Sequence, residues 1–198
     1  MVRPPPALLV SRAWTPRAAG AVVLALAAFF SWALLAVGAW AALLTLLRDG
    51  WRPAAVLAAV CAVPFLGFNA ALAAGWGYDP IGTLEATEGV YRNSLASIRP
   101  YWCWVVGSPA AWALAAGLPI VIAAGRHATL ASVATFSVIG IASVLGFTKA
   151  ETERIWLFLV ALACVAAAEH VPTGRLRLVV ALLLGQALGM QLLFQTVW

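Results

Sequence analysis

The chain has 198 residues, of which 64% are hydrophobic and only 10% are charged, and its formal net charge is +5. Soluble domains have about 45 to 50% apolar and about 25% charged residues, so the composition excludes a soluble globular domain. The basic residues are dispersed among apolar runs and form no patch, so no nucleic acid is expected as a partner. About 20 apolar residues in a helix cross a hydrocarbon core of about 30 Å. The repeated apolar runs therefore predict an all-α, multi-pass protein of the cell membrane.

The first part of the chain predicts a tail and two membrane spans. Residues 1–17 form a polar N-terminal tail. The apolar run 18–47 is about double the upper length of the apolar region of a secretory signal, so we expect a membrane anchor and not a cleaved signal. The second span covers 53–76, and Pro64 predicts a kink whose freed carbonyl a neighbouring helix must satisfy.

The hydrophilic segment 77–101 predicts an interfacial helix between the second and third spans. Asp79 followed by Pro80 is typical of a helix N-cap and first helical position, although Gly82 could delay the start to Thr83. Apolar residues then recur at helical spacing along one face: Leu84, Tyr91, Leu95 and Ile98. This pattern is that of an amphipathic helix lying in the membrane surface.

The second half of the chain predicts four more spans. They cover residues 102–124, 128–147, 149–168 and 178–198. The third of these contains only 14 uncharged residues, from Ile155 to Ala168. Thr148 and Glu151 stand in the T-x-x-E order of a capping box, so this helix can begin at Lys149 and reach spanning length. The sequence thus predicts one helical domain over 18–198, a transmembrane bundle of about six spans with one interfacial helix.

Six spans place the polar segments on two membrane surfaces. The segment 77–101 and the turn 148–154 lie on one side, together with both termini, whereas the loops at 48–52, 125–127 and 169–177 lie on the other. The first side gathers five residues that we select as candidates for binding a lipid phosphate or an acceptor: Asp79, Arg99, Tyr101, Glu151 and Arg154. Arg offers a planar fork of donors to a phosphate, and a carboxylate near a cation can act as a base. The alternative is that these side chains are interfacial caps and ion pairs.

Histidine and cysteine residues do not predict a metal site. His127 and His170 each stand alone at a span end, and no motif of metal-ligand spacing includes them. The three cysteines are widely spaced in or beside apolar runs, which favours small packing residues over a disulfide framework. We therefore expect neither a metal nor a cofactor.

Three stretches resemble a known group of membrane proteins. The succession GYDPIGTLEATEGVYRNSLASIRPYWCW, GFTKAETERIWLFL and GQALGMQLLFQTVW is similar to the C-terminal half of actinobacterial polytopic membrane proteins related to the GT-C glycosyltransferases. The resemblance implies transfer of a sugar from a polyprenyl-phosphate donor, with Asp79, Arg99, Tyr101, Glu151 and Arg154 positioning donor phosphate or acceptor. The N-terminal helices and first acidic loop of these relatives have no counterpart here, so the catalytic base is not assigned.

Two interpretations of the chain follow from this resemblance. The chain is either the C-terminal module of a glycosyltransferase, whose true start lies upstream of Met1, or a non-catalytic six-helix scaffold or subunit that pairs with a partner membrane protein. A small transporter is a third reading, which the lack of an internal repeat disfavours.

Overall fold

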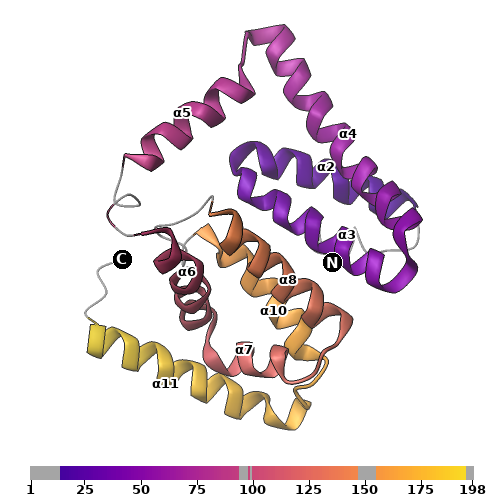
Figure 1. The fold of residues 1–198 in the computed structure, drawn as a ribbon. Coiled ribbons are helices and arrows are strands. Elements are labelled where there is room, and N and C mark those ends of the chain that lie inside the picture. The colour runs from indigo at the N-terminus through magenta and orange to yellow at the C-terminus, as the bar shows by residue number, and fades with distance from the viewer. Residues whose placement is uncertain (1–13, 94–97, 99, 147–154, 195–198) are drawn as a thin grey trace. The chain divides into compact units, whose positions relative to one another are not determined.

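The computed structural model describes residues 14–93, 98, 100–146 and 155–194, which form helices and no strand (Figure 1). The predicted all-α fold class is thus confirmed. The chain divides into two compact units, residues 1–101 and 102–198, and each is described by itself.

The first unit is built on one long helix. Its elements are α2 (Trp14–Phe30), the short 3-10 helix η1 (Trp32–Leu34), α3 (Leu35–Asp49), α4 (Trp51–Trp76) and α5 (Pro80–Arg92). α4 continues through Pro64 and packs against both α2 and α3. The face of α2 that is buried carries mostly small side chains at helical spacing, Ala21, Leu24, Ala25 and Ala28. Small residues let helix backbones approach closely, which is how helices pack where lipid removes the hydrophobic driving force.

The apolar run 18–47, within which the first span is predicted, is not one continuous helix, because the chain breaks at Ser31. Ser31 adopts an extended conformation (φ −157°, ψ 112°) between α2 and η1. An unbroken helix over this run would be about 45 Å long, well beyond a hydrocarbon core of about 30 Å. The break lets the aromatic residues on either side pack on α4, with ring centroids 5.3 Å apart for Phe29 and Phe68 and 5.8 Å apart for Trp32 and Phe65. The aromatic contacts with α4 thus stabilise the broken form more than the backbone hydrogen bonds of a continuous helix would.

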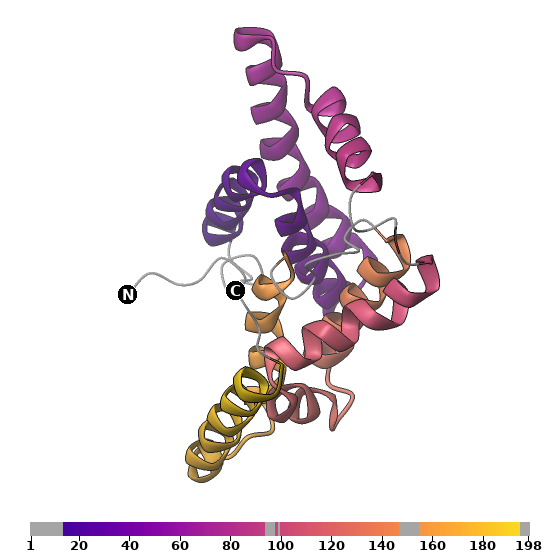
Figure 2. The same cartoon turned by 90° about the vertical axis from the view of Figure 1, so that its left-hand side faces the viewer.

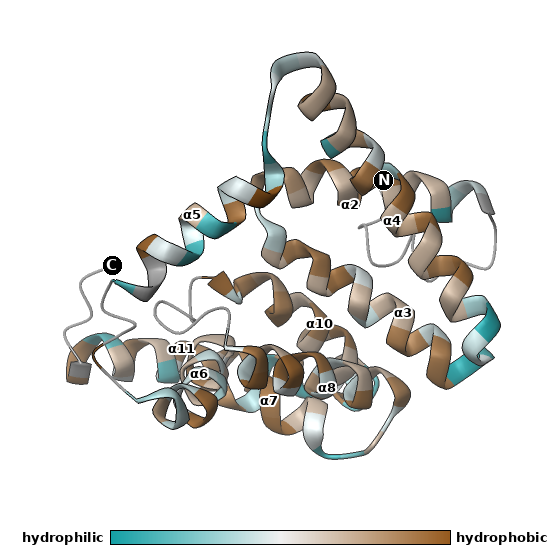
Figure 3. Cartoon of the chain, turned by 45° about the horizontal axis from the view of Figure 1, so that its top comes forward, coloured by the Kyte–Doolittle hydropathy of each residue, from teal (hydrophilic) through white to brown (hydrophobic). Residues whose placement is uncertain are grey.

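The expected start of the interfacial helix is confirmed. Asp79 Oδ1 accepts hydrogen bonds from Ile81 N at 3.1 Å and Gly82 N at 2.9 Å, and α5 begins at Pro80. Nearly all described side chains of α5 are exposed. The chain turns back between α4 and α5 (Figure 2), and hydrophilic and hydrophobic residues alternate along α5 in contrast to the mainly hydrophobic α4 (Figure 3). This helix has the mixed surface that an interfacial position requires.

The second unit contains a broken helix and an antiparallel helix pair. Its elements are α6 (Tyr101–Ala116), α7 (Leu118–Gly125), α8 (Leu130–Leu145), α10 (Leu157–Ala168), the 3-10 helix η3 (Thr173–Arg175) and α11 (Leu176–Phe194). α10 packs on both α7 and α8, and α11 contacts α7.

Among the described residues, three or four helical segments have the length of a span, whereas the sequence predicts about six over the whole chain. In the described part of the chain, Trp32–Asp49, Trp51–Trp76 and Thr173–Leu193 are long and apolar enough to cross a membrane. α6 and α7 add a fourth span only if they are taken together, and they are bent by 108°. α8 has 16 residues and α10 has 12, and both are shorter than a full span. These helices mark the chain as a membrane protein.

The break between α6 and α7 is bridged by a side chain from α11. In a continuous helix Leu118 N–H would donate to the carbonyl of Leu114. Instead Leu118 N donates to Gln186 Oε1 at 2.8 Å, and Gln186 Nε2 donates to Leu114 O at 2.7 Å. The Gln186 side-chain amide thus replaces the missing backbone hydrogen bond, because it gives a partner to Leu118 N–H and to the Leu114 carbonyl.

The sequence Gly117-Leu118-Pro119 explains the position of this break. Pro119 has no N–H and its ring clashes with a preceding helical turn, but it is tolerated at the start of a new helix. Gly117 has φ 93°, a conformation that side chains disfavour. A Cβ on Gly117 would also collide with Leu183 Cδ2, so the missing side chain allows the close approach of α11.

We expect Gly117→Ala to destabilise the protein by about 1 to 3 kcal/mol, because alanine combines a strained φ with overpacking against Leu183. The midpoint of thermal unfolding in detergent, followed by tryptophan fluorescence, measures this loss. Gly140→Ala is the matched control, since a Cβ there meets nothing within 4 Å and the residue lies in α8. Equal midpoints for the two variants would show that the break does not depend on Gly117.

We expect Gln186→Leu to destabilise the second unit, because it leaves Leu118 N–H and Leu114 C=O without their partner at a cost of about 1 to 3 kcal/mol for each group. Amide hydrogen exchange at Leu118 should accelerate selectively. Leu188→Ala, at an exposed position on the same helix, is the control. Unchanged protection of Leu118 in Gln186→Leu would contradict the bridge.

Candidate functional site

The structure describes two of the five residues predicted to bind phosphate or acceptor. Asp79 is exposed and its carboxylate caps α5, while Tyr101 is the exposed first residue of α6. Arg99, Glu151 and Arg154 lie outside the described residues, as does the capping box of Thr148 and Glu151. The grouping of these five residues into one site therefore stays a prediction.

The structure brings the two histidines of the chain together. His127 lies between α7 and α8, and His170 follows the end of α10. Their ring centroids are 4.6 Å apart and the ring planes are inclined by 50°. His127 is exposed, whereas His170 is half-buried, and its Nε2 is shielded from solvent and has no hydrogen-bond partner among the described residues. The expectation that each histidine stands alone is thus wrong, because helix packing joins two distant loops.

Alanine packing fixes the two loops that carry the histidine pair. Ala124, Ala131, Ala166 and Ala167 form one buried cluster shared by α7, α8 and α10. α8 leads away from the histidine pair and α10 returns to it, so the pair closes one end of the antiparallel helices. His170 N donates a backbone hydrogen bond of 2.9 Å to Ala167 O, three residues earlier, which forms a turn at the end of α10. The rings therefore meet because the alanines allow their helices to approach.

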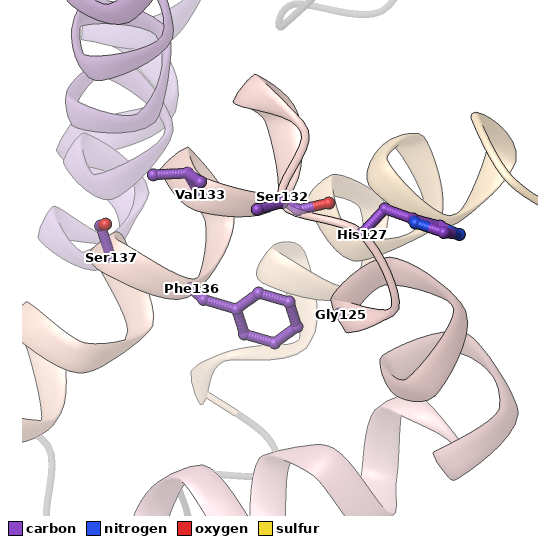
Figure 4. A pocket seen from close by; sticks show the side chains of 7 residues that line it. Gly125, His127, Ser132, Val133, Phe136 and Ser137 are labelled. Carbon is purple, nitrogen blue, oxygen red and sulfur yellow. The ribbon is translucent and has the colours of Figure 1, made fainter.

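A pocket of about 400 Å³ lies beside His127 (Figure 4). Gly125, His127, Ala128, Ser132, Val133, Phe136 and Ser137 line it. Phe136 points towards Gly125, with ring atoms 3.6 Å from the position of a Cβ on that glycine, while the His127 ring points away from Phe136. Thr129 caps α8 by accepting a hydrogen bond from Ser132 N, which holds the rim. The walls are mainly apolar, and the polar lining side chains are those of His127, Ser132 and Ser137.

The sequence around this pocket is rich in positive charge. Arg126 stands between the pocket residues Gly125 and His127, and Arg175 and Arg177 follow shortly after His170. All three side chains are exposed, and none forms an ion pair with a described residue. Glu169 is the acidic residue of these two loops. An exposed guanidinium group next in sequence to an apolar pocket, with no ion pair to a described residue, can bind an amphiphile with an anionic head.

Sequence reasoning missed this site although one signal for it was present. The predicted topology already places the loops 125–127 and 169–177 on the same membrane surface. It does not say that α7, α8 and α10 come close enough for the rings to touch. Among the residues that the structure describes, no group of three or more His, Cys, Asp or Glu has an arrangement suited to a metal ion.

Comparisons with known proteins do not assign the chain to a family. No protein-family model, curated protein or solved structure matches it. The function must therefore be argued from the residues of the pocket and its surroundings.

Proposed function

We propose that the chain is a multi-pass protein of the cell membrane that binds a phosphate-bearing lipid of the polyprenyl-phosphate class. The observation that carries the proposal is an apolar pocket beside Arg126, an exposed arginine with no ion pair among the described residues. Polyprenyl phosphates join an apolar chain to an anionic head, and binding one requires both kinds of surface. The pocket is an open depression of about 400 Å³, so an apolar chain would lie along it and not be enclosed by it.

Arg126 suits the phosphate head for two reasons. A guanidinium group offers two parallel N–H donors to phosphate oxygens, and this charge-assisted pair is stronger than a neutral hydrogen bond. Because no carboxylate of the described residues holds Arg126, no ion pair has to break when phosphate binds. Arg175 and Arg177 add positive potential that attracts an anionic lipid.

Sugar transfer from such a lipid is the reaction that the resemblance to the GT-C glycosyltransferases implies. Asp79, Arg99, Tyr101, Glu151 and Arg154 are the residues that this resemblance assigns to positioning the donor phosphate or the acceptor. Arg99, Glu151 and Arg154 lie outside the described residues.

We expect Arg126→Gln to lower the affinity for farnesyl phosphate about tenfold or more, because it removes a charge-assisted hydrogen bond worth about 1.5 to 3 kcal/mol. Binding of the labelled ligand to the purified protein in detergent measures the change. Farnesol, which has the same chain without phosphate, should bind weakly to both proteins. Arg52→Gln is the control, since Arg52 lies over Trp51 in the first unit and its loss changes the net charge equally.

Two results would overturn the proposal. Equal binding of farnesol and farnesyl phosphate to the unaltered protein would remove the role of phosphate. Equal losses in Arg126→Gln and Arg52→Gln would reduce the effect to net charge. Either result would favour the reading of the chain as a non-catalytic scaffold or subunit.

A further inference from the structure

We propose that His127 and His170 form a two-histidine site for a transition-metal ion of the Zn²⁺, Cu²⁺ or Ni²⁺ class. This inference is independent of lipid binding, because it rests on the contact between the two rings and not on Arg126. Three features of the pair support it: the proximity of the rings, the shielded nitrogen of His170, and the rigidity of the packing below them.

The ring geometry suits two ligands of one ion. The centroids are 4.6 Å apart and the planes are inclined by 50°, so the rings are not stacked face to face. Imidazole nitrogen binds Zn²⁺ at about 2.0 to 2.1 Å, and two nitrogens on one ion must therefore converge to within about twice that distance. His127 is exposed, so its ring can turn towards the common ion without displacing core residues.

The shielded nitrogen of His170 needs a partner. Its Nε2 is buried away from solvent, and no described residue forms a hydrogen bond with it. Buried polar atoms in folded proteins almost always have a hydrogen-bond partner, and an exception calls for an explanation. A metal ion held between His127 and His170 supplies that partner.

The helices hold both ligands in place before an ion binds. The cluster of Ala124, Ala131, Ala166 and Ala167 fixes α7, α8 and α10 against one another just below the rings. Only small movements of the side chains are then needed on binding. A site of this kind costs less ordering entropy than one assembled from mobile loops.

The ligand set selects the metal. Imidazole is a preferred ligand of Zn²⁺, Cu²⁺ and Ni²⁺, whereas Mg²⁺ and Ca²⁺ prefer carboxylate and carbonyl oxygens. Two protein ligands leave the other positions to water or to an anion, so the ion should exchange readily. The charges nearby oppose one another, since Arg126, Arg175 and Arg177 disfavour a cation and Glu169 favours one. An anionic ligand on the open positions would offset the arginine charges.

The test exploits the fact that His127 and His170 are the only histidines in the chain. The full-length protein carries a purification tag without histidine and receives one equivalent of Cu²⁺ in detergent. Electron paramagnetic resonance with spin-echo modulation then counts the imidazoles on copper. We expect two imidazoles, competition by Zn²⁺ and no competition by Mg²⁺.

Single variants decide whether both rings bind the same ion. His127→Ala and His170→Ala should each leave one imidazole and lower the affinity by at least about tenfold, because even loss of an outer-shell partner costs a metal site that much. Ser132→Ala, which alters the pocket without removing an imidazole, should keep two. Circular dichroism checks the folding of His170→Ala, while the exposed His127 can be replaced without disturbing the core.

Three results would overturn the site. The first is a wild-type spectrum with no coordinated imidazole or only one. The second is a two-imidazole signal that survives in His127→Ala. The third is a two-imidazole signal that becomes a one-imidazole signal on dilution while copper stays bound, since the second ligand would then come from another molecule.

Discussion

The Gln186 amide in the break between α6 and α7 is the interaction on which the second unit depends. Lipid offers no water to hydrogen-bond a freed backbone group, so a broken helix in a membrane protein must find its partners in the protein. Gln186 serves both groups of the break, the N–H of Leu118 and the carbonyl of Leu114. It also ties α11 to the unit, which matters because none of its spanning segment Thr173–Leu193 is buried. The direction of α7 is fixed at its first residue, and the loop carrying Arg126 and His127 follows from that direction.

Alanine packing links the direction of α7 to the position of the histidine pair. Helices in lipid associate through close van der Waals contact and not through the hydrophobic effect, and small side chains give the closest contact. In the second unit Ala124 on α7 and Ala166 on α10 belong to one buried cluster, directly below His127 and His170. The break thus sets the direction of α7, the alanine cluster packs α7 against α8 and α10, and this packing brings the two rings into contact. A substitution at Gln186 should therefore change the position of the histidine rings indirectly, through α7, without any contact between α11 and the rings.

The sequence predicts the local features of this fold better than its tertiary ones. Composition and the length of the apolar runs together predict the all-α membrane class. Asp79-Pro80 correctly predicts the start of α5, because a cap depends on neighbouring residues only. Proline by itself does not locate the breaks. α4 continues through Pro64 and α6 through Pro109, whereas the chain breaks at Gly117 two residues before Pro119. The break at this position requires both a glycine with a positive φ and a glutamine from another helix. The contribution of the glutamine cannot be predicted from the sequence next to the break. The histidine pair escapes prediction for the same reason, since it depends on how closely three helices pack.

Among the polar side chains that the structure describes, some bond within their own helix and others reach a different element. Thr45, Thr135 and Ser143 are buried, and each donates to the carbonyl four residues earlier in its own helix. Such residues are satisfied locally and need no further role. Gln186 and the histidines instead reach across elements. Gln186 finds partners for both ends of its amide, so its role is complete within the protein. His170 contacts the His127 ring, and its shielded Nε2 forms no hydrogen bond with a described residue. Gln186 uses both groups of its amide within the protein, whereas Nε2 of His170 keeps the bonding capacity that the proposed metal ion would take up.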